Sequence, residues 1–110
     1  MTVPLVQPVL KINFFVTMWD TPSSNETSLG GVLGVLPVHP TVRGAGTTLV
    51  SPDLPGAVRR ALAADGIWSV VATGAAGDVS PRAHRREQTP AEVDRLGALA
   101  AAAMLSAVAT

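Results

Sequence analysis

The sequence has 110 residues, with eight basic and eight acidic side chains and no cysteine. This length corresponds to one ordinary domain and excludes a two-domain enzyme for this chain. The formal charge of zero argues against nucleic acid or an anionic membrane as a partner, and the absence of cysteine excludes disulfides and thiolate metal ligands.

The first half of the chain is poor in charge. Residues 1–50 hold only four of the 16 charged side chains, so we expect this half either to be largely buried or to lack the partner that covers it. The segment 10–18 is rich in β-branched and aromatic residues and predicts a strand, whereas the polar segment 20–31 predicts a loop. The apolar segment 32–38 predicts a second strand, antiparallel to the first, and Pro37 places its end at an edge or a break.

The segment 53–66 carries the clearest helical pattern. Asp53 is its candidate N-cap, Pro55 falls in the first turn and Gly66 follows its end. The next segment, 67–73, is a nearly continuous apolar run, which is typical of a strand covered on both faces. A strand, a helix and a strand in this order predict a parallel pair joined by a right-handed crossover.

The segment 89–109 predicts an alanine-rich helix. Thr89 is its candidate N-cap, Pro90 falls in the first turn and Glu92 completes a capping box. Its charge-free part, 96–110, is too short to span a membrane. We therefore expect an α/β fold: a small mixed sheet with a strand–helix–strand unit and a C-terminal alanine-rich helix.

Two long loops, 40–52 and 74–88, each follow one of the strands predicted to be parallel. Ligands of open α/β sheets bind outside the carboxyl ends of the strands, and long loops in compact domains are often functional. This placement nominates His39 and Ser80 as site residues. The other histidine, His84, lies among three arginines that would repel a metal ion, so we expect this basic run to be a solvated loop face.

The sequence GAAGD directly follows the second predicted strand. Gly74 and Gly77 allow a sharp turn that exposes backbone N–H groups, which suit an anion or an oxyanion. Asp78 would cap this loop through its own backbone or orient a partner. Ser80 is either a nucleophile or a turn residue, and His39 is either a functional imidazole or one held by loop carbonyls. The residues alone leave both alternatives open.

The chain contains four stretches in a fixed order: VHPT at 38–41, SPDLPGAV at 51–58, VVATGAAGDVSPR at 70–82 and RLGALAAAAM at 95–104. Together they resemble the neutral/alkaline non-lysosomal ceramidase family. The resemblance covers about residues 33–108, and its most specific part is HPT followed by GDVSP after an apolar strand.

The resemblance implies a zinc amidohydrolase that cleaves the N-acyl bond of ceramide or a related lipid amide. It implies that His39 is a zinc ligand and that Ser80 works beside the metal at the scissile carbonyl, with the loop at Gly74, Gly77 and Asp78 supporting the oxyanion. Family members take their other zinc ligands from an upstream histidine motif and from a downstream glutamate and tyrosine. This sequence has no tyrosine and no match to those segments.

We therefore expect residues 1–110 to form one partial domain of a larger α/β catalytic domain, inactive without the remainder of the parent domain. Residues 1–31 would supply a strand and a polar loop, and residues 32–110 the ceramidase-like segment. Arg82 stands where the best-known members have asparagine, which leaves the substrate open.

Two alternatives remain from the sequence. One is a non-catalytic α/β module that binds phosphate or another anion at the GAAGD loop, and the other is a truncated reading frame without independent function. No signal peptide is visible in 1–110, so we expect a soluble chain. The parent protein could be either secreted or cytoplasmic.

Overall fold

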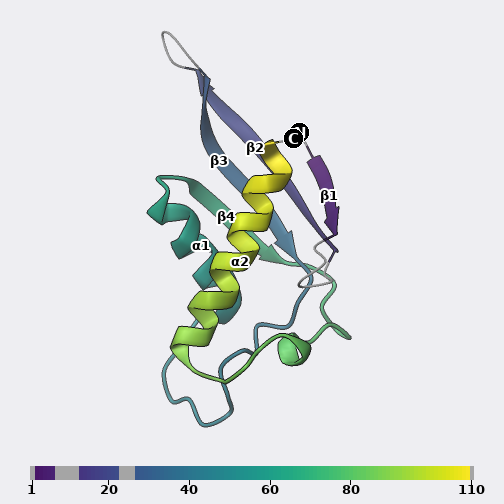
Figure 1. Ribbon diagram of the computed structural model, residues 1–110, viewed down its shortest axis with the longest axis vertical. Coiled ribbons are helices and arrows are strands. Elements are labelled where there is room, and N and C mark those ends of the chain that lie inside the picture. Colours follow the sequence, from purple (N-terminus) through teal and green to yellow (C-terminus); the bar gives the residue numbers. More distant parts are fainter. Residues whose placement is uncertain (1, 7–12, 23–26, 110) are drawn as a thin grey trace.

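The computed structural model describes residues 2–6, 13–22 and 27–109 (Figure 1). Strands and helices follow one another along these ranges as β1 Thr2–Val6, β2 Asn13–Pro22, β3 Thr27–Leu36, α1 Asp53–Ala64, β4 Trp68–Thr73 and α2 Pro90–Ala109. A short 3₁₀ turn, Pro81–Ala83, lies between β4 and α2. Neither helix in these ranges combines the length and the apolar character that a membrane crossing requires.

These strands form one mixed sheet in the order β1-β2-β3-β4. β2 pairs antiparallel with β1 and β3, whereas β3 and β4 are parallel and are connected through α1. The expected α/β fold, with its strand–helix–strand unit and its C-terminal helix, is confirmed. β3 ends at Leu36, opposite Thr73 of β4, because Pro37 has no N–H to continue the ladder. Both strands therefore end at the same edge of the sheet.

The β2–β3 hairpin is longer than its sequence suggests. The two strands stay paired as far as Pro22 opposite Thr27. The prediction of a loop over 20–31 is therefore wrong, because threonine and serine on both arms suit strand pairing once the partner arm is present. Residues 10–12 of the predicted first strand and 23–26 of the predicted loop lie outside the described residues.

Along β3 and β4, one face of the sheet is covered and the other is open. Val32 and Leu36 of β3 are buried, whereas the alternate residue Leu33 is 38% exposed. Its partner on β4, Val70, is 43% exposed, and Trp68 is 61% exposed. The prediction that this strand is covered on both faces is therefore wrong. Both helices pack on the Val32 face, and an apolar run does not report how many faces are covered.

The core lies between the covered face and the helices. It unites Val32 and Leu36 with the buried stripes of α1 and α2 and with Val38 and Val42 of the loop that follows β3. The two helices touch at Gly97, where a Cβ atom would lie 2.4 Å from the Cβ of Ala57. Because Val38 and Val42 are part of this core, the start of the first long loop is held in place by buried side chains.

The predicted helix starts are confirmed at α2 and corrected at α1. Thr89 caps α2, because its Oγ1 accepts the amide of Glu92 at 3.2 Å. At α1 the cap position is Pro52, whereas Asp53 has a positive φ of 53°. The Asp53 carboxylate accepts the amide of Leu54 at 2.8 Å and also ties down the preceding loop, as described below.

Candidate functional site

His39 and Ser80 line the same open hollow at the carboxyl edge of β3 and β4. The two loops that leave this edge run side by side at the lower end of the molecule (Figure 1). The hollow has a volume of about 520 Å³ and is lined by His39, Thr41, Arg43, Gly44, Ala45, Ser80, Arg82, Arg85 and Gln88. The structure thus brings together the two residues that the sequence nominates from different loops. We call this place the His39–Ser80 hollow.

His39 joins the two loops through its backbone and its side chain. Its amide donates to the carbonyl of Val79 at 2.9 Å. Its ring atom Nε2 lies 3.3 Å from the carbonyl oxygen of Gly77, so a hydrogen bond there needs the proton on Nε2. This contact matches the alternative of a histidine held by a loop carbonyl, and it leaves Nδ1 as the acceptor of the ring.

The GAAGD loop forms a tight turn whose amides are partly used within the fold. The amide of Gly74 donates to the carbonyl of Leu36 at 3.2 Å, and the amide of Val79 donates to Ala76 at 3.1 Å. Gly74 is also needed for packing, because a Cβ atom there would lie 2.9 Å from Cγ1 of Val35. The Gly74 amide is therefore engaged rather than directed at a ligand.

The centre of that turn faces solvent. Gly77 and Asp78 are both exposed, and a Cβ atom at Gly77 would meet nothing within 4 Å. Neither residue is among those that line the His39–Ser80 hollow, although the Gly77 carbonyl holds the ring of His39. Within the described chain Gly77 therefore supports the position of His39, whereas Asp78 has no contact that links it to the hollow.

Ser80 caps the 3₁₀ turn that follows it. Its Oγ accepts the amide of Arg82 at 3.2 Å, which is the turn role weighed for it from the sequence. The hydroxyl hydrogen of Ser80 is not consumed by this bond. An amide donor to Oγ also stabilises any negative charge that the oxygen gains, so the same geometry suits a reacting hydroxyl.

The basic run after Ser80 is only partly a solvated face. Arg82 is exposed as predicted, but Arg85 donates from Nη1 to the carbonyl of Thr41 at 2.6 Å and so links the two loops. His84 is half-buried, and its carbonyl accepts Nη2 of Arg95 at 3.0 Å. The prediction of a solvated loop face therefore holds for Arg82 and Arg86, whereas His84 and Arg85 find carbonyl and apolar partners on neighbouring elements that the local sequence does not reveal.

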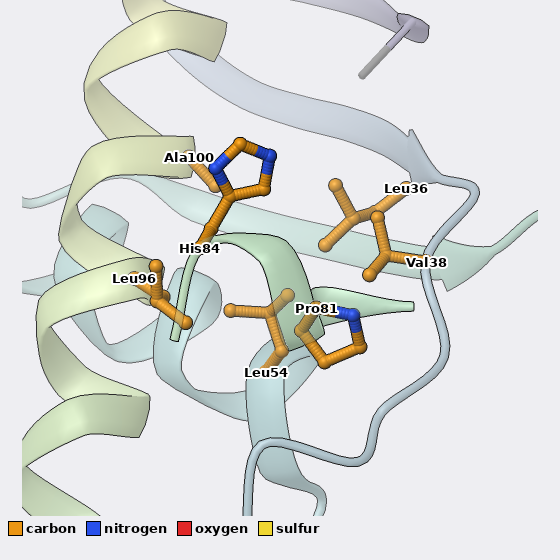
Figure 2. A pocket seen from close by; sticks show the side chains of 7 residues that line it. All are labelled: Leu36, Val38, Leu54, Pro81, His84, Leu96 and Ala100. Atoms are coloured by element: carbon orange, nitrogen blue, oxygen red, sulfur yellow. The ribbon is translucent and has the colours of Figure 1, made fainter. Parts of the chain in front are cut away.

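A small apolar cavity lies next to the hollow, under the ring of His84 (Figure 2). It is lined by Leu36, Val38, Leu54, Pro81, His84, Leu96 and Ala100. Its volume of about 10 Å³ is near the lower limit for one water molecule. The cavity therefore does not admit an acyl chain in this conformation, and the half-buried His84 contributes to its lining.

Glu92 fixes the end of the second loop. Its predicted capping-box carboxylate turns toward Arg95, whose Nη2 donates to Oε2 at 2.9 Å, and toward the amide of Arg86. The hydrogen bond from Arg95, followed by that from the Arg86 amide, lowers the pKa of Glu92 from 4.5 to about 2. Because Arg95 also holds His84, one buried carboxylate orders the segment that carries Arg85.

We expect Glu92→Gln to remove an acid-sensitive part of the stability. The folded pKa of Glu92 lies below its ordinary value, so ionised Glu92 stabilises the fold fully above about pH 4.5, and this stabilisation is lost as the pH falls toward about 2. Urea unfolding across this range should show a shallower loss of stability for Glu92→Gln than for the unchanged protein. Glu87→Gln, which alters an exposed carboxylate, is the control, and equal slopes for all three proteins would contradict this role.

The described residues do not fit a zinc ion. No three His, Asp or Glu side chains within them are grouped so that they could hold a metal, whereas a catalytic zinc takes about three protein ligands. Three arginines, Arg43, Arg82 and Arg85, line the His39–Ser80 hollow and would repel a dication. On these residues, His39 would be a single ligand.

Comparisons with protein-family models, with curated proteins and with solved structures find no match to this sequence. The resemblance described above therefore rests on its sequence motifs alone. Sequence reasoning missed Thr41, Arg43, Arg85 and Gln88 as lining residues of the hollow. Their positions in the two long loops were the available signal, but nothing local distinguishes them from other polar loop residues.

Proposed function

We propose that this chain carries the His39–Ser80 part of the active site of a ceramidase-like amidohydrolase. The observation that carries the proposal is the shared hollow: the two residues singled out by the family resemblance come from different loops and line one surface depression. The family's zinc ion would need further ligands from elsewhere in a parent domain. The substrate would be the N-acyl amide of ceramide or of a related lipid.

Ser80 has the more favourable local geometry for a role at the scissile carbonyl. It lies at an exposed position, its hydroxyl hydrogen is available, and the Arg82 amide at 3.2 Å would stabilise Oγ as it becomes negative. The Gly77 carbonyl restrains the ring of His39, and that restraint would orient Nδ1 toward a ligand. These contacts support a preformed arrangement of the two side chains.

A non-catalytic anion-binding module is the second candidate. It is favoured by the three arginines that line the hollow; in the GAAGD loop, the amide of Gly74 already has a backbone partner. In that case the hollow would bind phosphate or another anion without breaking a bond. The two candidates differ in whether Ser80 is needed for turnover.

Hydrolysis by the full-length product of the gene tests the proposal. With a fluorescent N-acylsphingosine and a short N-acyl amide as substrates, we expect Ser80→Ala to lower kcat/KM by about 100-fold or more. The matched control is Ser106→Ala, an exposed serine on α2, which should stay within about twofold. Release of fatty acid that survives Ser80→Ala would exclude Ser80 from the reaction. No release of fatty acid by the unchanged protein from neutral or anionic N-acyl amides would contradict the hydrolase proposal.

A further inference from the structure

We propose that the His39–Ser80 hollow is an oxyanion subsite in which Arg82, with Arg43 and Arg85, binds a compact carboxylate or phosphate group. The substrate class that follows rests on the proposed function: the preferred substrate is an acyl amide with an anionic group near the amide bond. Neutral ceramide would then be a poor substrate.

The side chains that line the hollow give it a positive charge. Three arginines line the hollow, and no aspartate or glutamate is among its lining residues within the described chain. The ion pairs of the described residues involve other arginines, Arg60 with Asp94 and Arg95 with Glu92. A depression with three cations and no lining acid has a positive potential that attracts an anion.

Asp53 contacts Arg43, but its carboxylate bonds to the backbone amide of Arg43 and not to the guanidinium. Its two oxygens accept backbone amides of Val42, Arg43 and Leu54 at 2.8–2.9 Å. Asp53 is only 6% exposed and does not line the depression. The guanidinium of Arg43 therefore has no carboxylate partner among the described residues.

The arrangement is also partly ordered before a ligand arrives. Arg85 is held by the Thr41 carbonyl at 2.6 Å through one of its nitrogen atoms, which leaves other donors of the same planar group for an anion. The backbone amide of Arg82 is fixed on Ser80, which places the root of its side chain beside the candidate hydroxyl. Thr41 and Ser80, which also line the hollow, each carry a hydroxyl that is able to donate to an anion.

Direct binding of inorganic phosphate tests the subsite without any reaction. Isothermal titration calorimetry of the full-length protein with inorganic phosphate should show saturable binding that weakens as salt is added. Arg82→Gln should weaken phosphate binding by about 10-fold to 100-fold, because a charge-assisted hydrogen bond is lost. The matched control is Arg59→Gln, an exposed arginine of α1 outside the hollow, which should change the affinity by less than about twofold.

Kinetics with two short substrates then test the substrate class. N-hexanoylglycine carries a carboxylate beside its amide, and its N-methylamide is the neutral counterpart. Arg82→Gln should raise KM for the first by about 10-fold and leave KM for the second unchanged. Equal effects of Arg82→Gln and Arg59→Gln on phosphate binding, or no saturable binding, would overturn the subsite.

The two proposals fail in distinguishable ways. Ser80-dependent hydrolysis of neutral amides without phosphate binding would overturn the subsite and leave the hydrolase proposal standing. Arg82-dependent phosphate binding without hydrolysis of any amide would support the subsite and overturn the hydrolase proposal. A preference for the neutral N-methylamide over N-hexanoylglycine would overturn the assignment of an anionic substrate.

Discussion

Replacing Asp53 by alanine should lower the free energy of unfolding by about 3–4 kcal/mol, a large part of the stability of a small domain. The carboxylate accepts the amides of Val42 and Leu54 inside the protein and that of Arg43 at its border. Alanine would leave these donors without their partner and would also have to adopt the positive φ of 53°. The first long loop and the start of α1 would then lose their common anchor.

Two further variants separate these contributions in urea unfolding. Asp53→Gly relieves the strain of the positive φ but removes the acceptor oxygens. Asparagine in Asp53→Asn tolerates the positive φ and keeps one acceptor oxygen. We expect stability to fall in the order unchanged protein, Asp53→Asn, Asp53→Gly, Asp53→Ala. An Asp53→Ala protein within about 1 kcal/mol of the unchanged protein would contradict the anchoring role.

Replacing Gly97 by alanine should separate the two helices and cost about 2–3 kcal/mol. The new Cβ would lie 2.4 Å from Cβ of Ala57 and 3.0 Å from the amide nitrogen of Val58, so backbone as well as side-chain atoms would have to move. The higher helix propensity of alanine would offset only about 1 kcal/mol of this overpacking.

Gly46→Ala is the matched control, because a Cβ atom there would meet nothing within 4 Å. Thermal unfolding of the two variants should show a lower midpoint for Gly97→Ala and little change for Gly46→Ala. Equal midpoints for both would mean that α1 and α2 are not packed as closely as described.

Much of the fold is predictable because its signals are local. The capping threonine before α2, Gly66 after α1 and the proline that follows β3 mark element ends in the sequence itself. The open face of β4 was not predictable, because its apolar run is the same whether one or two layers cover it. Likewise, the full length of the β2–β3 hairpin depends on pairing between arms and not on the propensity of either arm.

The candidate site, like the fold, was predictable from the sequence only in part. The common edge of two parallel strands predicts that His39 and Ser80 lie together, and the structure places both at one hollow. The link from Arg85 to Thr41 and the turn of Glu92 toward Arg95 and Arg86 cross between segments. No local pattern specifies such contacts, so the positive lining of the hollow emerges only from the folded chain.

The most direct test of the central claim is a double-mutant cycle on amide hydrolysis by the full-length gene product, with His39→Ala, Ser80→Ala and the double variant. If the two residues act in one site, the double variant should lose about as much kcat/KM as the more damaged single variant. Losses that multiply, or full activity of His39→Ala, would contradict the claim that His39 and Ser80 belong to one active site.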